Sequence, residues 1–395
     1  MKAKKIRILT FVDYYLPGFK AGGPIRTIAN MASQFGSEFE ILIVTRDRDF
    51  SDEEPYPDVL TDQWNSLGHA KVLYSSPEAL SFLGIRRLLK ETSHDVLYLN
   101  SFFSPFVTIM PLIIRRIGLY DNKPVILAPR GEFSVGALAL KATKKKLFFS
   151  FAKFTGIYRQ VTWQASSELE SEDILRTMLN VTDTPNIFIA PDLVPLPNQM
   201  LEEADWTNEY LRPAGPLRII FLSRISPMKN LDYLLSVLSN VNSPVVLSIY
   251  GPVEDTVYWL FCQRLIQSLP THINVSYKGE VMHEHVAQTF FLHDVFIFPT
   301  RGENFGHVIY EALAVGTAVI VSDQTPWQQD SHGGVTVIAL EQPDVWTEVI
   351  GQWAVFNDID YASRRTASIG YATNYQLSNQ ALEQNRNLFL SVLDR

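Results

Sequence analysis

Two glutamates lie eight positions apart in the segment RGENFGHVIYEALAVGTAVIVSD. Glu303 precedes an apolar, helix-like run, and Glu311 falls inside that run. If the helix begins near Phe305 or Gly306, Glu311 lies about 8 Å along its axis at ~1.5 Å per residue. The N–H groups of the helix N-terminus lie between the two acids and favour a negatively charged ligand. This spacing suits an elongated ligand with hydroxyl groups at both ends and phosphate in the middle.

A nucleotide-sugar has this layout, with Glu303 on the sugar hydroxyls and Glu311 on the ribose hydroxyls. The residues beside these two acids that we also expect to contact it are Asn304, Phe305, Gly306 and His307. A simpler alternative exists for each acid. Glu303 can merely complement the helix dipole, and Glu311 can be an exposed helix position.

Two cations follow the strand-like run at residues 217–222 in the segment SRISPMKN. Arg224 offers a planar fork of donors and Lys229 a point charge, which together can neutralise a diphosphate. Ordinary surface cations are the alternative for each. We expect Glu303, Arg224 and Lys229 to be the residues that act on the reacting groups.

The adjacent glycines Gly22 and Gly23 precede an apolar helical run. They allow the backbone to come close to a ligand, and the following helix N-terminus offers N–H groups to an anion. A tight strand–helix turn is the alternative. The dinucleotide pattern G-x-G-x-x-G is absent here.

Short β-branched or aromatic runs alternate with helical periodicity along the chain, which predicts buried parallel strands with helices on both faces. The predicted strands are residues 5–12, 39–45, 70–75, 95–100, 124–130, 161–166, 186–191, 217–224, 244–251, 273–279, 295–301, 318–323 and 335–340.

The proline-rich segment 191–200 has neither the periodicity of a strand nor that of a helix, which indicates a linker. We therefore predict an α/β protein of two doubly wound, Rossmann-like domains facing a cleft, residues 1–195 and 200–377, with a C-terminal helix at about 378–395 packing back on the first. Ligands of such sheets bind beyond the carboxyl ends of the strands, where the loops described above lie.

The sequence resembles family 4 glycosyltransferases of the GT-B fold. The double glycine, SRISPMKN and the E-x7-E block carry the resemblance. The segments TRDRDF, APRGEFSVGALALK and DQTPW further resemble a branch that makes bacterial surface polysaccharides, such as lipopolysaccharide, capsule or exopolysaccharide. The resemblance implies a donor site mainly in the second domain, an acceptor site in the first, and transfer with retention of anomeric configuration and without a metal or other cofactor.

One departure concerns the histidines that many members carry after the fourth strand as H-x-H. The corresponding positions here are Tyr98 and Asn100, and His94 lies at the opposite end of the strand. A histidine base is therefore not implied. In the front-face mechanism the leaving phosphate takes the acceptor proton, and Asn100 can hydrogen-bond the sugar. Arg130 can meet an acceptor phosphate, or form a loop salt bridge.

The segment KATKKKLFFSFAKFTGIYR, residues 141–159, mixes lysines with phenylalanines. A basic, aromatic helix suits an anionic membrane surface. Alternatively, the phenylalanines belong to the core and the lysines are solvated. Residues 1–200 hold 23 Lys and Arg against 21 Asp and Glu, whereas residues 201–395 hold 11 against 21. The first domain is thus the better candidate for a membrane-facing acceptor domain.

The composition and the motifs argue against several classes of protein. A net charge of −8 without a large basic face does not suit a nucleic-acid-binding protein. Asp47 and Asp49 in DRD resemble a metal-binding D-x-D, and His283 and His285 lie two apart, but neither pattern predicts a metal site here. One cysteine allows no disulfide, and the sequence suggests neither an export signal nor a membrane span. We therefore expect a cytoplasmic enzyme, peripheral on the inner face of the membrane.

Three functions remain. The first is transfer of a sugar from a nucleotide-sugar to a lipid-linked glycan. The second is a nucleotide-sugar 2-epimerase of the same two-domain fold, and the third is a two-lobed solute-binding module.

Overall fold

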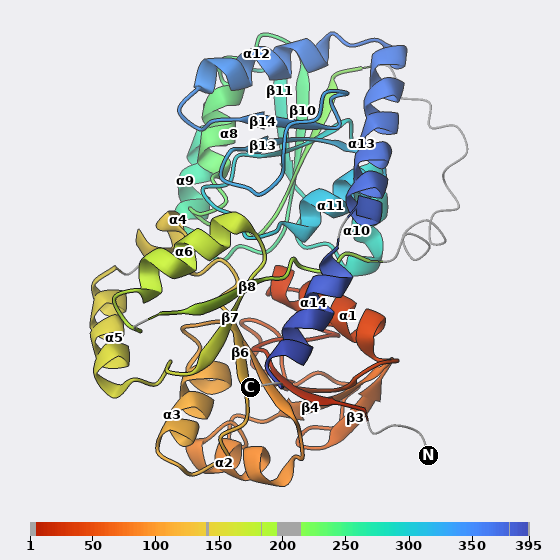
Figure 1. The fold of residues 1–395 in the computed structure, drawn as a ribbon. Helices are drawn as coiled ribbons and strands as arrows, with labels where there is room; N and C mark the ends of the chain where they lie inside the picture. Colours follow the sequence, from red (N-terminus) through yellow and green to blue (C-terminus); the bar gives the residue numbers. More distant parts are fainter. Residues whose placement is uncertain (1–4, 140–141, 183, 196–214, 379, 394–395) are drawn as a thin grey trace. The chain divides into compact units, whose positions relative to one another are not determined.

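The apolar runs form the strands of two separate sheets in the computed structural model, which describes residues 5–139, 142–182, 184–195, 215–378 and 380–393. The chain divides into two units (Figure 1). Met1–Leu193 and Gln380–Arg395 make up the first, and Val194–Asn379 makes up the second. The predicted linker lies partly outside the described residues, since it includes 196–200.

The first unit has an eight-stranded sheet in the order β3-β4-β2-β1-β5-β6-β7-β8, parallel except for β3. Its strands are β1 (Arg7–Phe11), β2 (Glu40–Arg46), β3 (Trp64–Leu67), β4 (Ala70–Ser75), β5 (Val96–Asn100), β6 (Val125–Ala128), β7 (Val161–Ala165) and β8 (Asn186–Ile189). The short edge strand β3 is not predicted from the sequence, because its residues WNSL have no apolar period.

Helices cover both faces of this sheet, and a separate apolar core lies on each face. They are α1 (Gly23–Phe35), α2 (Phe82–Glu91), α3 (Met110–Arg116) with a preceding π-helical turn (Pro105–Ile109), α4 (Val135–Ala139), α5 (Ala142–Thr155), α6 (Glu168–Met178) and the C-terminal α14 (Ala381–Ser391). The ring of Phe389 on α14 packs edge-on against Phe35, Phe39 and Tyr98, which joins the end of the chain to the first unit.

The second unit has a six-stranded parallel sheet in the order β11-β10-β9-β12-β13-β14. Its strands are β9 (Leu217–Leu222), β10 (Val245–Tyr250), β11 (Ile273–Tyr277), β12 (Val295–Phe298), β13 (Ala318–Ser322) and β14 (Val335–Ile338). Its helices are α8 (Leu231–Leu238), α9 (Thr256–Gln267), α10 (His283–Phe291), α11 (His307–Ala314), α12 (Pro343–Ala354) and α13 (Asp358–Ser378).

Both sheets are doubly wound, which confirms the predicted α/β fold class. Strands β12 and β13 are buried at every position, as expected for parallel strands covered on both faces. Within the part of the chain that the structure describes, no helix is both long and apolar enough to cross a bilayer.

Candidate active site

Three neighbouring strands, β9, β12 and β13, place their following loops side by side at the carboxyl edge of the second sheet. Backbone and side-chain hydrogen bonds join these loops. The Arg301 amide donates to Met228 O at 2.9 Å, and the Glu303 amide donates to Gln324 O at 3.0 Å. Asn230 donates to Pro299 O at 2.9 Å. The loop that carries Glu303 is therefore fixed from both sides.

Lys229 and Glu303, 74 positions apart in the sequence, meet in this corner. The Lys229 Nζ donates to Glu303 Oε2 at 2.7 Å. Their side chains are 11% and 18% exposed, and the ammonium group also lies 5.3 Å from the centre of the Phe298 ring. The pair is thus largely shielded from water, and each member can still be reached by a ligand.

Arg224 lies on the same loop as Lys229 but is more open. Its Nη1 donates to Glu254 Oε1 at 3.0 Å, and the two side chains are 35% and 31% exposed. A salt bridge exposed to this degree contributes little to stability, about 0–1 kcal/mol. The guanidinium can therefore exchange Glu254 for an anionic ligand at small cost.

The N-terminus of α11 follows directly. Gly306 caps the helix with a φ of +79°, a conformation that glycine adopts without strain. A Cβ at this position would lie 3.0 Å from Glu303 Cγ, so the glycine also makes room for that side chain. No described residue accepts a hydrogen bond from the N–H groups of Phe305 and Gly306. Two amide donors thus remain beside Glu303 for an anion.

The remaining residues of this block are more buried than expected. Glu311 is 7% exposed, which excludes the exposed helix position as an alternative. The Phe305 ring is 4% exposed and packs against Trp327 and Tyr375 in the core of the unit, and its centre lies 4.8 Å from that of the His307 ring. The Phe305 side chain therefore belongs to the core, and a contact of this residue with a ligand stays a prediction. Asn304 is partly buried, with its amide 3.2 Å from Glu303 Oε1.

In the first unit, Gly22 and Gly23 stand at the start of α1. Gly22 has a φ of +77°, and a Cβ there would have no atom within 4 Å, so the backbone is open at this point. The preceding loop is held by Asp49, whose Oδ2 accepts from the amides of Phe19 and Lys20 at 2.8 and 3.1 Å. The open double glycine is consistent with a ligand-facing turn, and Asp49 has a structural partner.

Asn100 and Arg130 meet at the carboxyl edge of the first sheet, but in a buried network. Arg130 Nη2 donates to Asn100 Oδ1 at 2.7 Å, and its guanidinium also binds Asp192 and Tyr98. The Asn100 amide nitrogen lies 3.3 Å from Phe11 O. Asn100 is 2% exposed and the Arg130 side chain 6%. Arg130 thus forms the salt bridge given above as its alternative, and the contacts of Asn100 with a sugar and of Arg130 with an acceptor phosphate stay predictions.

The carboxylate of Glu132, two residues after Arg130, was not singled out from the sequence. It accepts from Ser101 Oγ at 2.9 Å and from the amides of Phe102 and Phe103, and so fixes the loop after β5. Burial raises the pKa of Glu132 to about 7, against the opposing effect of these three donors. In the sequence, Glu132 is distinguished only by its place in the segment PRGEF. Its burial cannot be predicted from that segment alone.

No metal site emerges among the described residues, where no group of three or more His, Cys, Asp or Glu side chains could hold an ion. Asp47 pairs with Arg48 at 2.8 Å, and Asp49 binds backbone amides. His285 lies 3.6 Å from Glu284 at the exposed start of α10. These two motifs thus have local partners.

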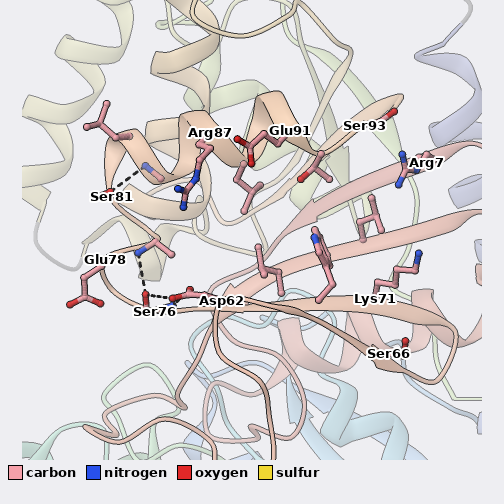
Figure 2. A pocket seen from close by; sticks show the side chains of 18 residues that line it. Arg7, Asp62, Ser66, Lys71, Ser76, Glu78, Ser81, Arg87, Glu91 and Ser93 are labelled. Carbon is pink, nitrogen blue, oxygen red and sulfur yellow. Dashed lines mark hydrogen bonds between the residues drawn. The ribbon is translucent and has the colours of Figure 1, made fainter.

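An open hollow of about 950 Å³ lies between α2 and the β3–β4 edge of the first sheet (Figure 2). Arg87 and Glu91 of α2 line it on one side, and Lys71 of β4 lines it on the other. None of the predicted site residues contributes to it. The hollow is therefore separate from the loops described above.

Residues 202–331 match the family model described as glycosyl transferases group 1. An uncharacterized 41.2 kDa protein in the cps region of Klebsiella pneumoniae is 25% identical over 292 residues, which cover 73% of this chain and 77% of that protein. An uncharacterized glycosyltransferase of Methanocaldococcus jannaschii is 29% identical over 133 residues, 32% of this chain and 31% of that protein.

Solved structures share the fold at low identity. Sucrose-phosphate synthase from Thermosynechococcus elongatus has a TM-score of 0.69 at 16% identity, covering 98% of this chain and 100% of its own. Anabaena HepE in complex with UDP and glucose has a TM-score of 0.69 at 13% identity, covering 99% and 100%. Residues 202–331 are therefore a glycosyltransferase group 1 domain, in a chain with the GT-B fold of these structures.

Proposed function

We propose that the protein transfers a sugar from a nucleotide-sugar to a lipid-linked glycan, with retention of configuration and without a metal, in the synthesis of a surface polysaccharide. The observation that carries the proposal is the Lys229–Glu303 pair at 2.7 Å beside the two open amides that precede α11. This arrangement sets a cation for phosphate next to a carboxylate for sugar hydroxyls. The HepE structure with UDP and glucose supports the same donor class.

In this proposal Arg224 and Lys229 bind the diphosphate together with the N–H groups of Phe305 and Gly306. Glu303 binds hydroxyls of the transferred sugar, and Glu311 binds the ribose. These groups stabilise the charge that develops as the bond between the sugar and the leaving phosphate breaks. The cations and amides supply positive charge at the point where other transferases use a metal.

The acceptor hydroxyl then attacks the sugar from the face that the phosphate leaves. Its proton passes to a phosphate oxygen, and its oxygen forms the new glycosidic bond to the anomeric carbon. No protein base is needed, which agrees with Tyr98 and Asn100 standing in place of the histidines. The chain contributes positioning and electrostatic stabilisation.

The acceptor assignment rests on the relative from the cps region and on the basic helix α5 of the first unit. A lipid-linked acceptor would bring the protein to the inner face of the membrane, with residues 141–159 as the contact; Lys141 lies outside the described residues.

The test is incubation with a panel of nucleotide-sugars, with and without membrane lipid extract, in the presence and absence of a chelator. We expect labelled sugar to enter the lipid fraction only when extract is present, and equally well with chelator. An altered nucleotide-sugar formed without extract would establish the epimerase instead. Binding of free sugar without any turnover would favour the solute-binding module. Loss of activity on chelation, restored by manganese, would refute the metal-independent mechanism.

A further inference from the structure

Helix α5 of the first unit carries apolar residues on opposite faces. Its inner face packs on the core of the unit: Ala152 is fully buried, and Phe148 and Phe149 are partly buried against the same cluster. The Phe149 ring lies 5.7 Å from that of Phe102. Two of the four phenylalanines of this helix are therefore structural.

The opposite face presents an apolar stripe to solvent. Leu147 is 74% exposed, Phe151 44% and Phe154 92%. Positions i, i+4 and i+7 lie on one face of a helix, so these three side chains form a continuous strip along α5. Exposing a leucine and two phenylalanines on one strip does not stabilise the fold. A contiguous apolar surface of this kind indicates a binding site.

Lysines flank the stripe. At 3.6 residues per turn, Lys144 lies on one side of the strip, and Lys146 and Lys153 lie on the other. Their side chains have no hydrogen-bond or ion-pair partner among the residues that the structure describes. Lys145 differs, because it turns inward and donates to Ala137 O at 2.6 Å.

The segment that carries the stripe has charged residues of one sign only. Residues 134–160 contain six lysines and arginines and no aspartate or glutamate. Arg116 at the end of α3 adds another cation, since it donates to Thr155 O at 3.1 Å at the carboxyl end of α5. Helix α5 lies at one side of the first unit, close to α3 and α4 (Figure 1).

We propose that the outer face of α5 binds an anionic lipid bilayer, with Leu147, Phe151 and Phe154 inserted among the acyl chains and Lys144, Lys146 and Lys153 at the headgroups. An exposed apolar strip bordered by lysines is the pattern of helices that lie in the membrane interface. The absence of acidic residues in 134–160 selects anionic lipid over a neutral surface. The reason for membrane binding rests on the proposed function, because a lipid-linked acceptor lies in the membrane. The binding itself is measured without any sugar and does not depend on that function.

The experiment is sedimentation of the full chain with vesicles of phosphatidylcholine alone and of phosphatidylcholine with phosphatidylglycerol. We expect binding to the anionic vesicles only, and loss of binding as salt rises. Replacing the three lysines by Gln should weaken the partition coefficient about a hundredfold, because each lysine contributes roughly fivefold. Phe151→Ser with Phe154→Ser should weaken it at least tenfold.

Matched controls come from α9 of the second unit, where Val257 and Phe261 are 78% and 45% exposed and lie four positions apart, on one face of the helix. Val257→Ser with Phe261→Ser should leave lipid binding unchanged. Uridine diphosphate affinity, measured for every variant, reports folding and the proposed donor site independently of lipid.

Three results would overturn the inference. They are binding to neutral and anionic vesicles alike, wild-type partitioning of the phenylalanine variant, and a concentration-dependent dimer that this variant abolishes. In the last case the stripe is an interface between copies of the chain. Normal lipid binding without sugar transfer would refute the proposed function alone.

Discussion

Replacing Gly306 by Ala tests whether the position of Glu303 matters to the chemistry. Gly306 has a φ of +79°, and in this conformation an L-residue costs about 1–2 kcal/mol. The new Cβ would lie 2.9 Å from Ile309 Cδ1 and 3.0 Å from Glu303 Cγ. Carbon atoms at rest are about 3.5–4.0 Å apart, so the Glu303 side chain must move by roughly half an ångström.

Such a shift should disturb the Lys229–Glu303 pair and lower turnover. Since a misplacement of about 1 Å can cost about a hundredfold in rate, we expect kcat to fall roughly tenfold. The assay is the initial rate at saturating donor and acceptor, together with urea unfolding to measure the free energy of unfolding.

Gly279→Ala is the matched control. Its φ is +80°, in the same unit, and a Cβ there would meet no atom within 4 Å. It should lose the same ~1–2 kcal/mol of stability and keep normal turnover. Equal kcat values for the two variants would show that the position of Glu303 does not matter to turnover, because both variants carry the same backbone strain and only Gly306 adjoins Glu303.

Further predictions concern the charged groups. Arg224→Ala and Lys229→Ala should each weaken binding of free nucleoside diphosphate by about 1.5–3 kcal/mol in calorimetry, and unchanged affinity in both would remove them from the diphosphate site. Glu311→Gln should weaken diphosphate and donor alike, whereas Glu303→Gln should lower kcat and spare diphosphate binding; similar effects from both would refute this division. For Glu132, burial raises the pKa from 4.5 to about 7, so the folded state retains a proton that the unfolded chain releases. The free energy of unfolding should therefore fall by up to about 3 kcal/mol as pH rises from 4.5 to about 7, and Glu132→Gln should remove this slope in pH-dependent urea unfolding.

The helices, the strands and the fold class can be predicted from the sequence alone. Strands such as AVIVS and VFIF are continuous apolar runs, and the helices between them have their own period, so α/β alternation is visible locally. The spacing of Glu303 and Glu311 is also a local property, because only a short turn and the first turn of α11 separate them.

Contacts between residues far apart in the sequence depend on the order of the strands in each sheet, which the sequence does not reveal. Lys229 reaches Glu303 because β9 and β12 are neighbours in the sheet although two strands separate them in sequence. Arg130 and Asn100 carry polar groups at a strand end, as site residues do, yet Asp192 from a proline-rich segment binds the guanidinium and buries it.

The same limit applies to α5, where the sequence shows four phenylalanines without distinguishing Phe148 and Phe149 from Phe151 and Phe154. The helical period predicts that α5 has two apolar faces. Which face is buried depends on where the sheet of the first unit lies. A side chain is buried by contacts with segments far apart in the chain. Its burial therefore cannot be predicted from the residue types of its own segment.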